Sequence, residues 1–203
     1  MHPVSHLHLA SSSQSRKALL SLSSIPFHAI EQHADELAID HTLPLEHLVS
    51  TIAILKMEHA VLPSEQENAL FVVSADTLSV DMHGVVHGKP RDYDDAKEKI
   101  KAFRSGSIVS TSFCLDKKVY KNNTWQTDQR IVRAVSSYCI FNVPDEWIDN
   151  YIQNSGALQA TGGITIEAFG MQFLEKVEGS YSTILGLPLF ELRESLTELG
   201  FFK

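Results

Sequence analysis

The sequence has few of the features that mark secreted, membrane-spanning or disulfide-linked proteins. It contains only two cysteines, Cys114 and Cys139, both in apolar surroundings and without a CxxC spacing. We therefore expect two reduced core thiols, with neither a disulfide nor a zinc site. No apolar run approaches the roughly 20 residues that cross a bilayer. No cationic stretch leads into an apolar one near residue 1, so we expect a cytoplasmic protein that does not contact membranes.

Positive charge is also scarce. Lys and Arg total 17 against 25 Asp and Glu, which gives a formal net charge of -8 at pH 7. Proteins that bind nucleic-acid polymers usually carry a basic face, so the charge argues against that partner but not against a mononucleotide. The ten histidines do not cluster, apart from His6 and His8 on one face of the first expected strand. We therefore expect no histidine metal site.

The elements that the patterns predict alternate between strand and helix. At 203 residues, 43% hydrophobic and 21% charged, the chain suits one soluble α/β domain, with or without two lobes. Asp116-Lys117-Lys118 is interpreted as a charged turn between two antiparallel strands. The order of the elements indicates an α/β fold with a mixed sheet. Strands are expected at 4–10, 25–30, 70–73, 108–115, 119–120, 131–141 and 171–177, and helices at 16–22, 45–60, 90–104, 145–153 and 189–199.

The stretch from Leu70 to Pro90 is the best candidate for a chemical site. A short apolar run is expected to form a buried strand that ends near Asp76, and the turn His87-Gly88 leads to Lys89. A carboxylate can hold a divalent metal or take a proton from water, and a nearby lysine can hold phosphate. The alternative is an exposed hairpin with two solvated charges.

The first strand leads into a run of serines, Ser11 to Ser15, and then into a helix that begins near Arg16. Backbone N–H groups, hydroxyls and a guanidinium at such a helix N-terminus can bind an anion. The alternative is a serine-capped helix with ordinary surface cations. The turn lacks the glycines of a P-loop or Rossmann turn, so neither is supported. Lys56, considered alone, is a solvated cation near a helix C-terminus.

Taken together, these segments resemble the Maf family, often described as septum-formation inhibitor proteins. The resemblance covers nearly the whole chain in the same order, and no single motif decides it. The matching segments are 9–20, Asp35-Glu36, Lys56, Ala75-Asp76-Thr77, Gly88-Lys89-Pro90, Ser105-Gly106, Thr111 and 178–189.

The resemblance implies a single domain over residues 1–203, with an elongated two-lobed body, a central cleft and a mixed sheet similar to the inosine-triphosphatase fold. It implies a nucleoside triphosphate pyrophosphatase that needs a divalent metal, Mg or Mn, removes modified nucleotides and forms a homodimer. Asp76 would be the general base, although a metal-ligand role looks the same in the sequence. The implied metal ligands are Glu36 and Asp76, and the implied phosphate ligands are Ser11, Ser13, Arg16, Lys56 and Lys89.

Departures from the family pattern leave the preferred base open. Ser15 replaces an arginine that the family associates with specificity, and Ser107 and Gln159 also differ. Glu167 falls where the group acting on 7-methyl-GTP has glutamate, whose oxygens accept from guanine N–H groups. Thr77 is typical of the dTTP and UTP group instead. A catalytically weakened regulator of cell division that binds nucleotide is the alternative function, and a purely structural α/β domain is a third.

Overall fold

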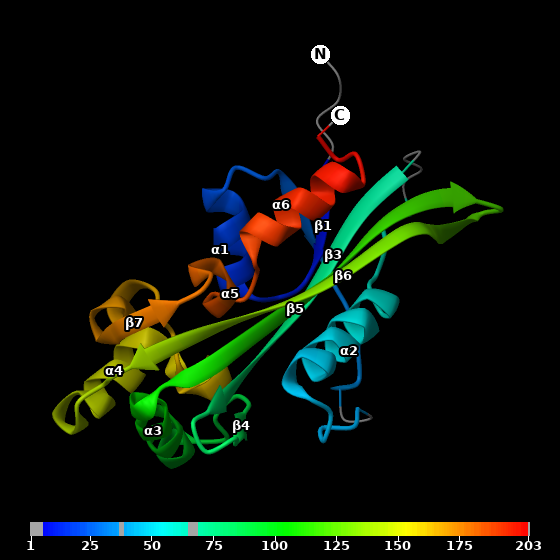
Figure 1. Cartoon of the computed structure of the whole chain (residues 1–203). Helices are drawn as coiled ribbons and strands as arrows, with labels where there is room; N and C mark the ends of the chain where they lie inside the picture. The colour runs from blue at the N-terminus through cyan, green and yellow to red at the C-terminus, as the bar shows by residue number, and fades with distance from the viewer. Residues whose placement is uncertain (1–5, 37–38, 65–68, 203) are drawn as a thin grey trace. The chain divides into compact units, whose positions relative to one another are not determined.

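A computed structural model describes residues 6–36, 39–64 and 69–202 (Figure 1). The chain forms two compact units. Unit 1 contains residues 1–76, 112–134 and 186–203, and unit 2 contains residues 77–111 and 135–185. The strands form a seven-stranded mixed sheet of hydrogen-bond order β2-β1-β3-β5-β6-β7, with β4 paired to β3. This confirms the α/β fold with a mixed sheet. Residues 4 and 5 of the first expected strand lie outside the described residues.

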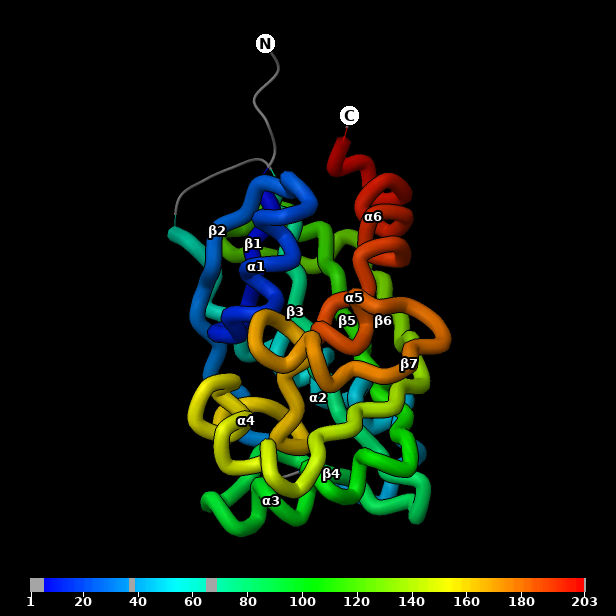
Figure 2. The backbone as a smooth tube through the Cα atoms, turned by 90° about the vertical axis from the view of Figure 1, so that its left-hand side faces the viewer, coloured from blue at the N-terminus to red at the C-terminus, as the bar shows by residue number. Residues whose placement is uncertain are grey.

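Unit 1 is built on parallel strands. β1 (Leu7–Ala10) pairs in parallel with β2 (Phe27–Ile30) and with β3 (Ala69–Asp81), and Figure 2 shows β2, β1 and β3 following one another in that order. Apolar residues fill most of β1 and the first half of β3, as expected of strands covered on both faces. The helices of unit 1 are α1 (Gln14–Leu22), α2 (Leu45–Glu58) and α6 (Leu189–Glu198).

The two faces of β3 pack against different helices. Leu70 and Val72 lie in one core cluster with Ala53 and Met57 of α2. Phe71, whose side chain points to the opposite face, makes an edge-to-face ring contact with Phe201, which follows α6. Figure 1 accordingly shows α2 on one side of these strands and α1 and α6 on the other. Both faces of the strands in unit 1 are therefore covered.

Unit 2 surrounds a core rich in aromatic residues. Phe103, Phe141, Tyr151 and Phe173 are buried there together with aliphatic residues. The Tyr151 hydroxyl lies 2.7 Å from the backbone nitrogen of Thr165, which donates to it. The elements that belong wholly to this unit are β4 (Val86–His87), α3 (Tyr93–Ala102), α4 (Ile148–Ser155), β7 (Leu174–Glu178), α5 (Tyr181–Ile184) and the 3-10 turns at 103–105, 145–147, 157–159, 161–163 and 168–173.

The expected strand boundaries are wrong in three places: within β3, between β5 and β6, and at 171–173, which lie in a 3-10 turn ahead of β7. β3 continues without interruption from Ala69 to Asp81, so Asp76 lies within a strand and not at its end. β5 (Ser107–Lys121) continues through the expected turn at 116–118, and β6 spans Thr124–Phe141. The turn between them is at Asn122 and Asn123, with φ of 53° and 62°. Asparagine tolerates the left-handed conformation that a tight hairpin turn needs.

The local signals at helix ends are confirmed. The Ser13 hydroxyl oxygen accepts from the N–H of Arg16, and Asp92 accepts from the N–H of Asp95, so both residues cap helices. Cys114 and Cys139 are buried and free, as expected. In the part of the chain that the structure describes, no helix is long and apolar enough to cross a membrane.

Candidate functional site

The ammonium of Lys56, near the end of α2, lies between two carboxylates. Its Nζ is 2.6 Å from Oδ1 of Asp76 and 2.9 Å from Oε1 of Glu36. The Lys56 and Asp76 side chains are 12% and 10% exposed, whereas that of Glu36 is 44% exposed. Three distant segments of unit 1 therefore meet in one ion cluster that is mostly shielded from water.

Asp76 owes its position to the end of the neighbouring strand. β1 pairs with β3 up to Leu9 opposite Val73 and ends at Ala10, which still pairs with Ile30 of β2. Asp76 follows in β3 just beyond that last pair, at the carboxyl end of β1, where open α/β sheets usually place ligands. Its Oδ2 is buried, and no donor among the described residues reaches it. A buried carboxylate oxygen without a donor can accept a hydrogen bond from a bound group.

Arg16 adds a buried cation to the same unit. Its Nε donates to the carbonyl of Gly186 at 2.7 Å, and its Nη1 donates to Oγ of Ser11 at 3.2 Å. Burial lowers the pKa of Arg16, and the carboxylates of Asp76 and Glu36 oppose that change. The cations of Arg16 and Lys56 and the carboxylates of Glu36 and Asp76 thus interact electrostatically. The Ser11–Ser13 turn lies beside Arg16.

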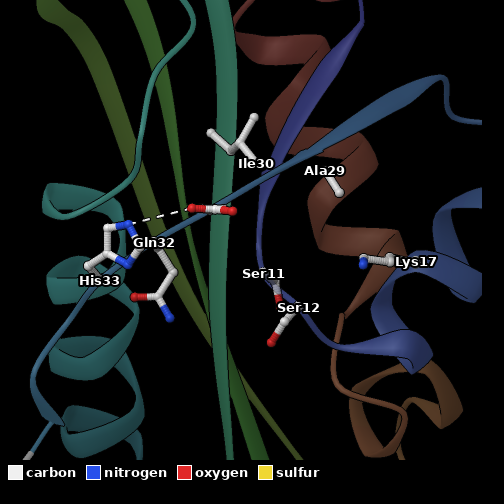
Figure 3. A pocket seen from close by; sticks show the side chains of 8 residues that line it. Ser11, Ser12, Lys17, Ala29, Ile30, Gln32 and His33 are labelled. Carbon is white, nitrogen blue, oxygen red and sulfur yellow. Dashed lines mark ion pairs between the residues drawn. The ribbon is translucent and has the colours of Figure 1, made fainter.

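An open pocket of about 310 Å³ adjoins this turn (Figure 3). It lies beyond the carboxyl ends of β1 and β2, and one wall carries the ion pair between His33 Nε2 and Glu31 Oε2, 3.6 Å apart. Ser11 belongs both to the pocket and to the Arg16 contact. The pocket is lined by Ser11, Ser12, Lys17, Ala29, Ile30, Glu31, Gln32 and His33.

Three of the predicted site residues belong to unit 2. The Thr77 hydroxyl lies 2.8 Å from that of Thr111, which itself donates to the carbonyl of Thr183 at 2.7 Å. Thr111 has a single hydroxyl proton, so Thr77 is the donor to it. Glu167 is half-buried, and its charge adds to the effect of burial in raising the pKa of Tyr181. Lys89 is exposed on the turn between β4 and α3.

The comparisons with known proteins identify the family. A family model described as "Maf-like protein" matches residues 6–199. The chain belongs to the Maf-like family. The dTTP/UTP pyrophosphatase of Syntrophus aciditrophicus is 30% identical over 194 residues, which cover 95% of this chain and 89% of the relative.

Two further relatives show the same extent of similarity. The dTTP/UTP pyrophosphatase of Shewanella oneidensis is 30% identical over 201 residues, covering 96% of this Maf-like chain and 98% of the relative. A nucleoside triphosphate pyrophosphatase of Rickettsia rickettsii is 33% identical over 197 residues, covering 95% of this chain and 87% of the relative. The membership of the Maf-like family that the motifs predicted is therefore confirmed.

The departures from the Maf pattern have different structural settings. Ser15 is half-buried in the first turn of α1, beside Arg16. Gln159 is exposed on a 3-10 turn of unit 2. Ser107 is 1% exposed, and its hydroxyl lies 3.3 Å from Sγ of Cys139. Ser107 is therefore a core residue of this Maf-like protein, and its departure concerns packing.

The carboxylates of this Maf-like site fit a divalent metal that shares its coordination with substrate. No group of three or more His, Cys, Asp or Glu in the described ranges could hold a metal by itself. Glu36 and Asp76, however, both approach the same Lys56 nitrogen, and Oδ2 of Asp76 has no donor. Mg²⁺ is commonly held by one or two carboxylates together with phosphate oxygens and waters. The donor set matches that kind of site.

The structure therefore brings most of the predicted residues together in unit 1: Ser11, Ser13, Ser15, Arg16, Glu36, Lys56 and Asp76. The motif analysis missed Lys99 of α3, whose Nζ donates to the backbone carbonyls of Gly88 and Lys89. The only local signal was its spacing of four residues from Asp95, which indicates a helical ion pair but no link to the turn.

Proposed function

We propose that this protein is a nucleoside triphosphate pyrophosphatase that cleaves between the α and β phosphates and releases a monophosphate and pyrophosphate. The observation that carries the proposal is the cluster in which Lys56 joins Glu36 and Asp76, close to the buried Arg16. The names of the relatives, two of them dTTP/UTP pyrophosphatases, support it.

The cations and hydroxyls have the chemistry that a triphosphate requires. Phosphoryl transfer depends mainly on positioning and on neutralising negative charge. Arg16, Lys56 and Lys89 would supply positive charge, and the hydroxyls of Ser11 and Ser13 would donate to phosphate oxygens. Lys56 is already paired with carboxylates, so phosphate binding requires it to share its donors between them and the substrate.

Asp76 is proposed as the general base. Lys56 holds Oδ1, which leaves the buried Oδ2 to accept a proton from the attacking water. The water oxygen bonds to phosphorus, the proton passes to Asp76, and the bond to the bridging oxygen breaks so that pyrophosphate departs. Glu36 would hold Mg²⁺ or Mn²⁺, joined by Asp76 if its carboxylate serves as a metal ligand in place of the general base. That ion when bound would neutralise charge on the phosphate oxygens.

The preferred base is the finer part of the proposal. Ser15, Thr77 and Glu167 are proposed as specificity residues. Thr77 and the names of two relatives favour dTTP or UTP, whereas the Glu167 carboxylate favours a guanine edge such as that of 7-methyl-GTP. We further propose, from the family resemblance, a cytoplasmic homodimer that removes modified nucleoside triphosphates.

The test is pyrophosphate release from a panel of standard and modified nucleoside triphosphates with Mg²⁺ or Mn²⁺. Asp76→Asn keeps the shape of the side chain but is a much weaker base, so release should fall by at least about 100-fold. Asp128→Asn, which changes an exposed carboxylate of β6, is the matched control and should leave the rate unchanged.

The other outcomes are equally informative. Nucleotide binding in calorimetry without release of pyrophosphate would replace the enzyme with the alternative function, a nucleotide-binding regulator of cell division. A wild-type protein that neither binds nor hydrolyses any nucleotide of the panel would overturn both functions.

A further inference from the structure

The turn that carries Lys89 is held by a second lysine. Lys99, on α3, places its Nζ 3.2 Å from the carbonyl oxygen of Gly88 and 3.0 Å from that of Lys89. The same Nζ lies 2.9 Å from Oδ2 of Asp95. An ammonium has three N–H donors, and these three acceptors use all of them. Lys99 therefore has no donor left for a substrate.

Asp95 anchors Lys99 to the start of α3. Its carboxylate also accepts from the backbone N–H of Arg91 at 2.9 Å, and these bonds hold the pKa of Asp95 well below its usual range. The side chains of Asp95 and Lys99 are each 15% exposed. The lysine thus reaches the turn from a fixed carboxylate on its own helix, four residues earlier, and its charge is already neutralised.

Other contacts fix the same turn from the remaining sides. The N–H of Gly162 donates to the carbonyl of Gly88 at 3.0 Å. Before the turn, Nε2 of His87 lies 2.8 Å from Oδ2 of Asp81, and the His87 ring packs 5.0 Å from that of Phe103. The backbone is therefore held at both ends of the segment.

The Lys89 side chain, unlike its backbone, is not held by neighbouring residues that the structure describes. It is exposed, and no carboxylate in the described part of the chain pairs with its ammonium. A lysine side chain loses much rotational freedom when it binds a ligand. Fixing the backbone on which it stands restricts where the ammonium can reach, and this lowers the cost of aligning it with phosphate.

We propose that Lys99 is a positioning residue that sets the place of the Lys89 ammonium by binding the two carbonyls of its turn. This inference rests on the proposed function, in which Lys89 binds the triphosphate. Lys99 acts only through Lys89, so the two residues are coupled energetically, and the coupling is measurable.

The experiment is a double-mutant cycle on kcat/KM for the best nucleotide of the panel. Lys99→Met removes the donors and keeps the length of the side chain, and we expect a loss of about 10- to 100-fold because misplaced binding groups cost that much. In a Lys89→Ala background the same change should cost no more than about 2-fold. A purely structural role would reduce activity equally in both backgrounds.

Lys101→Met is the matched control, because Lys101 is on the same helix, is exposed and pairs only with Glu98 among the described residues. It should leave kcat/KM unchanged. If Lys99→Met is not recovered folded, Lys99→Gln, which retains neutral N–H donors, takes its place, and an intermediate loss with the same coupling is expected. Circular dichroism verifies that each variant is folded.

The outcomes separate this inference from the proposed function. If the wild type turns over nucleotide but Lys99→Met keeps the kcat/KM of Lys101→Met, the positioning role alone is overturned. The same holds if Lys99→Met lowers kcat/KM equally in the wild-type and Lys89→Ala backgrounds. If the wild type binds nucleotide without turnover, the same double-mutant cycle is carried out on Kd measured by calorimetry. The expected losses of affinity are then the same as those given for kcat/KM. Neither binding nor turnover by wild type overturns the proposed function and this inference with it.

Discussion

Replacing Lys56 by methionine tests the ion cluster of unit 1 directly, because methionine keeps the apolar stem and removes only the ammonium. Both carboxylate oxygens approach the same nitrogen, at 2.6 and 2.9 Å. They consequently lie within about 5.5 Å of each other, and at an effective dielectric of about 20 their repulsion would be about 3 kcal/mol.

Two corrections set the expected size of the effect. The Glu36 side chain is 44% exposed, so water and salt reduce the repulsion to about 1–2 kcal/mol. Asp76 also loses the only ion-pair partner that it has among the described residues, while it stays buried. Removing one partner of a buried pair costs about 3–5 kcal/mol. With the partial exposure of the cluster, we expect Lys56→Met to lower the free energy of unfolding by about 3 kcal/mol.

Urea unfolding at neutral pH measures this, with the m-value unchanged. Lys56→Met combined with Asp76→Asn should recover about 2 kcal/mol, because the second change removes the charge that the first one leaves unpaired. Lys121→Met, at an exposed position of β5, is the control and should have little effect. A Lys56→Met protein within about 0.5 kcal/mol of wild type, or strictly additive effects in the double variant, would refute the reasoning.

Three further predictions concern other parts of the fold. Asp116 is fully buried and accepts two bonds from Arg130, and these bonds lower its pKa against the effect of burial. Asp116→Asn should cost about 3 kcal/mol at pH 7. The difference from wild type in urea unfolding should shrink as pH falls below about 4, where the unfolded carboxylate becomes protonated while the native one, with its lowered pKa, is still ionised. Burial raises the pKa of Cys114 to about 12, so native protein at pH 8 should react with iodoacetamide at this thiol far more slowly than unfolded protein; equal rates would contradict its placement. Gly106 has φ of 106°, and a Cβ there would overlap the Tyr138 ring. Gly106→Ala should therefore lower the free energy of unfolding by more than about 2 kcal/mol. A thermal melt like that of wild type would contradict this packing.

The sequence predicted best those features that depend on neighbouring residues. Ser13 and Asp92 cap helices as expected because a capping bond joins residues only two or three apart. The grouping of Arg16, Lys56 and Asp76 was predicted through the family resemblance, since no local pattern relates residues so far apart. Their contacts in unit 1 depend on the parallel pairing of β1 with β3 and on α2 packing against β3.

The failures arise where distant residues decide the local structure. The segment at 116–118 has the composition of a surface turn, yet Asp116 is buried inside β5 because Arg130 of β6 and Lys118 neutralise it. The expected end of a strand before Asp76 was wrong for a related reason. The unbroken apolar run stops at Val73, the last residue of β3 that pairs with β1, while β3 itself continues to Asp81. Ser74 and Asp76 are still buried, because the Ser74 hydroxyl donates to the carbonyl of Ala53 and Asp76 accepts from Lys56. Polar residues therefore continue a buried strand where their side chains find partners.

The bond from Arg16 to the carbonyl of Gly186 joins residues 170 positions apart. During synthesis, at about 5–20 residues per second, this guanidinium would wait on the order of 10–30 s before its acceptor is made. Residues 186–203 also belong to unit 1, whose first segment comprises residues 1–76. Nascent or truncated chains that end before Gly186 would therefore lack the bond that holds the Arg16 guanidinium in place. If the proposed function is correct, nucleotide binding would begin only after residues 186–203 have been made.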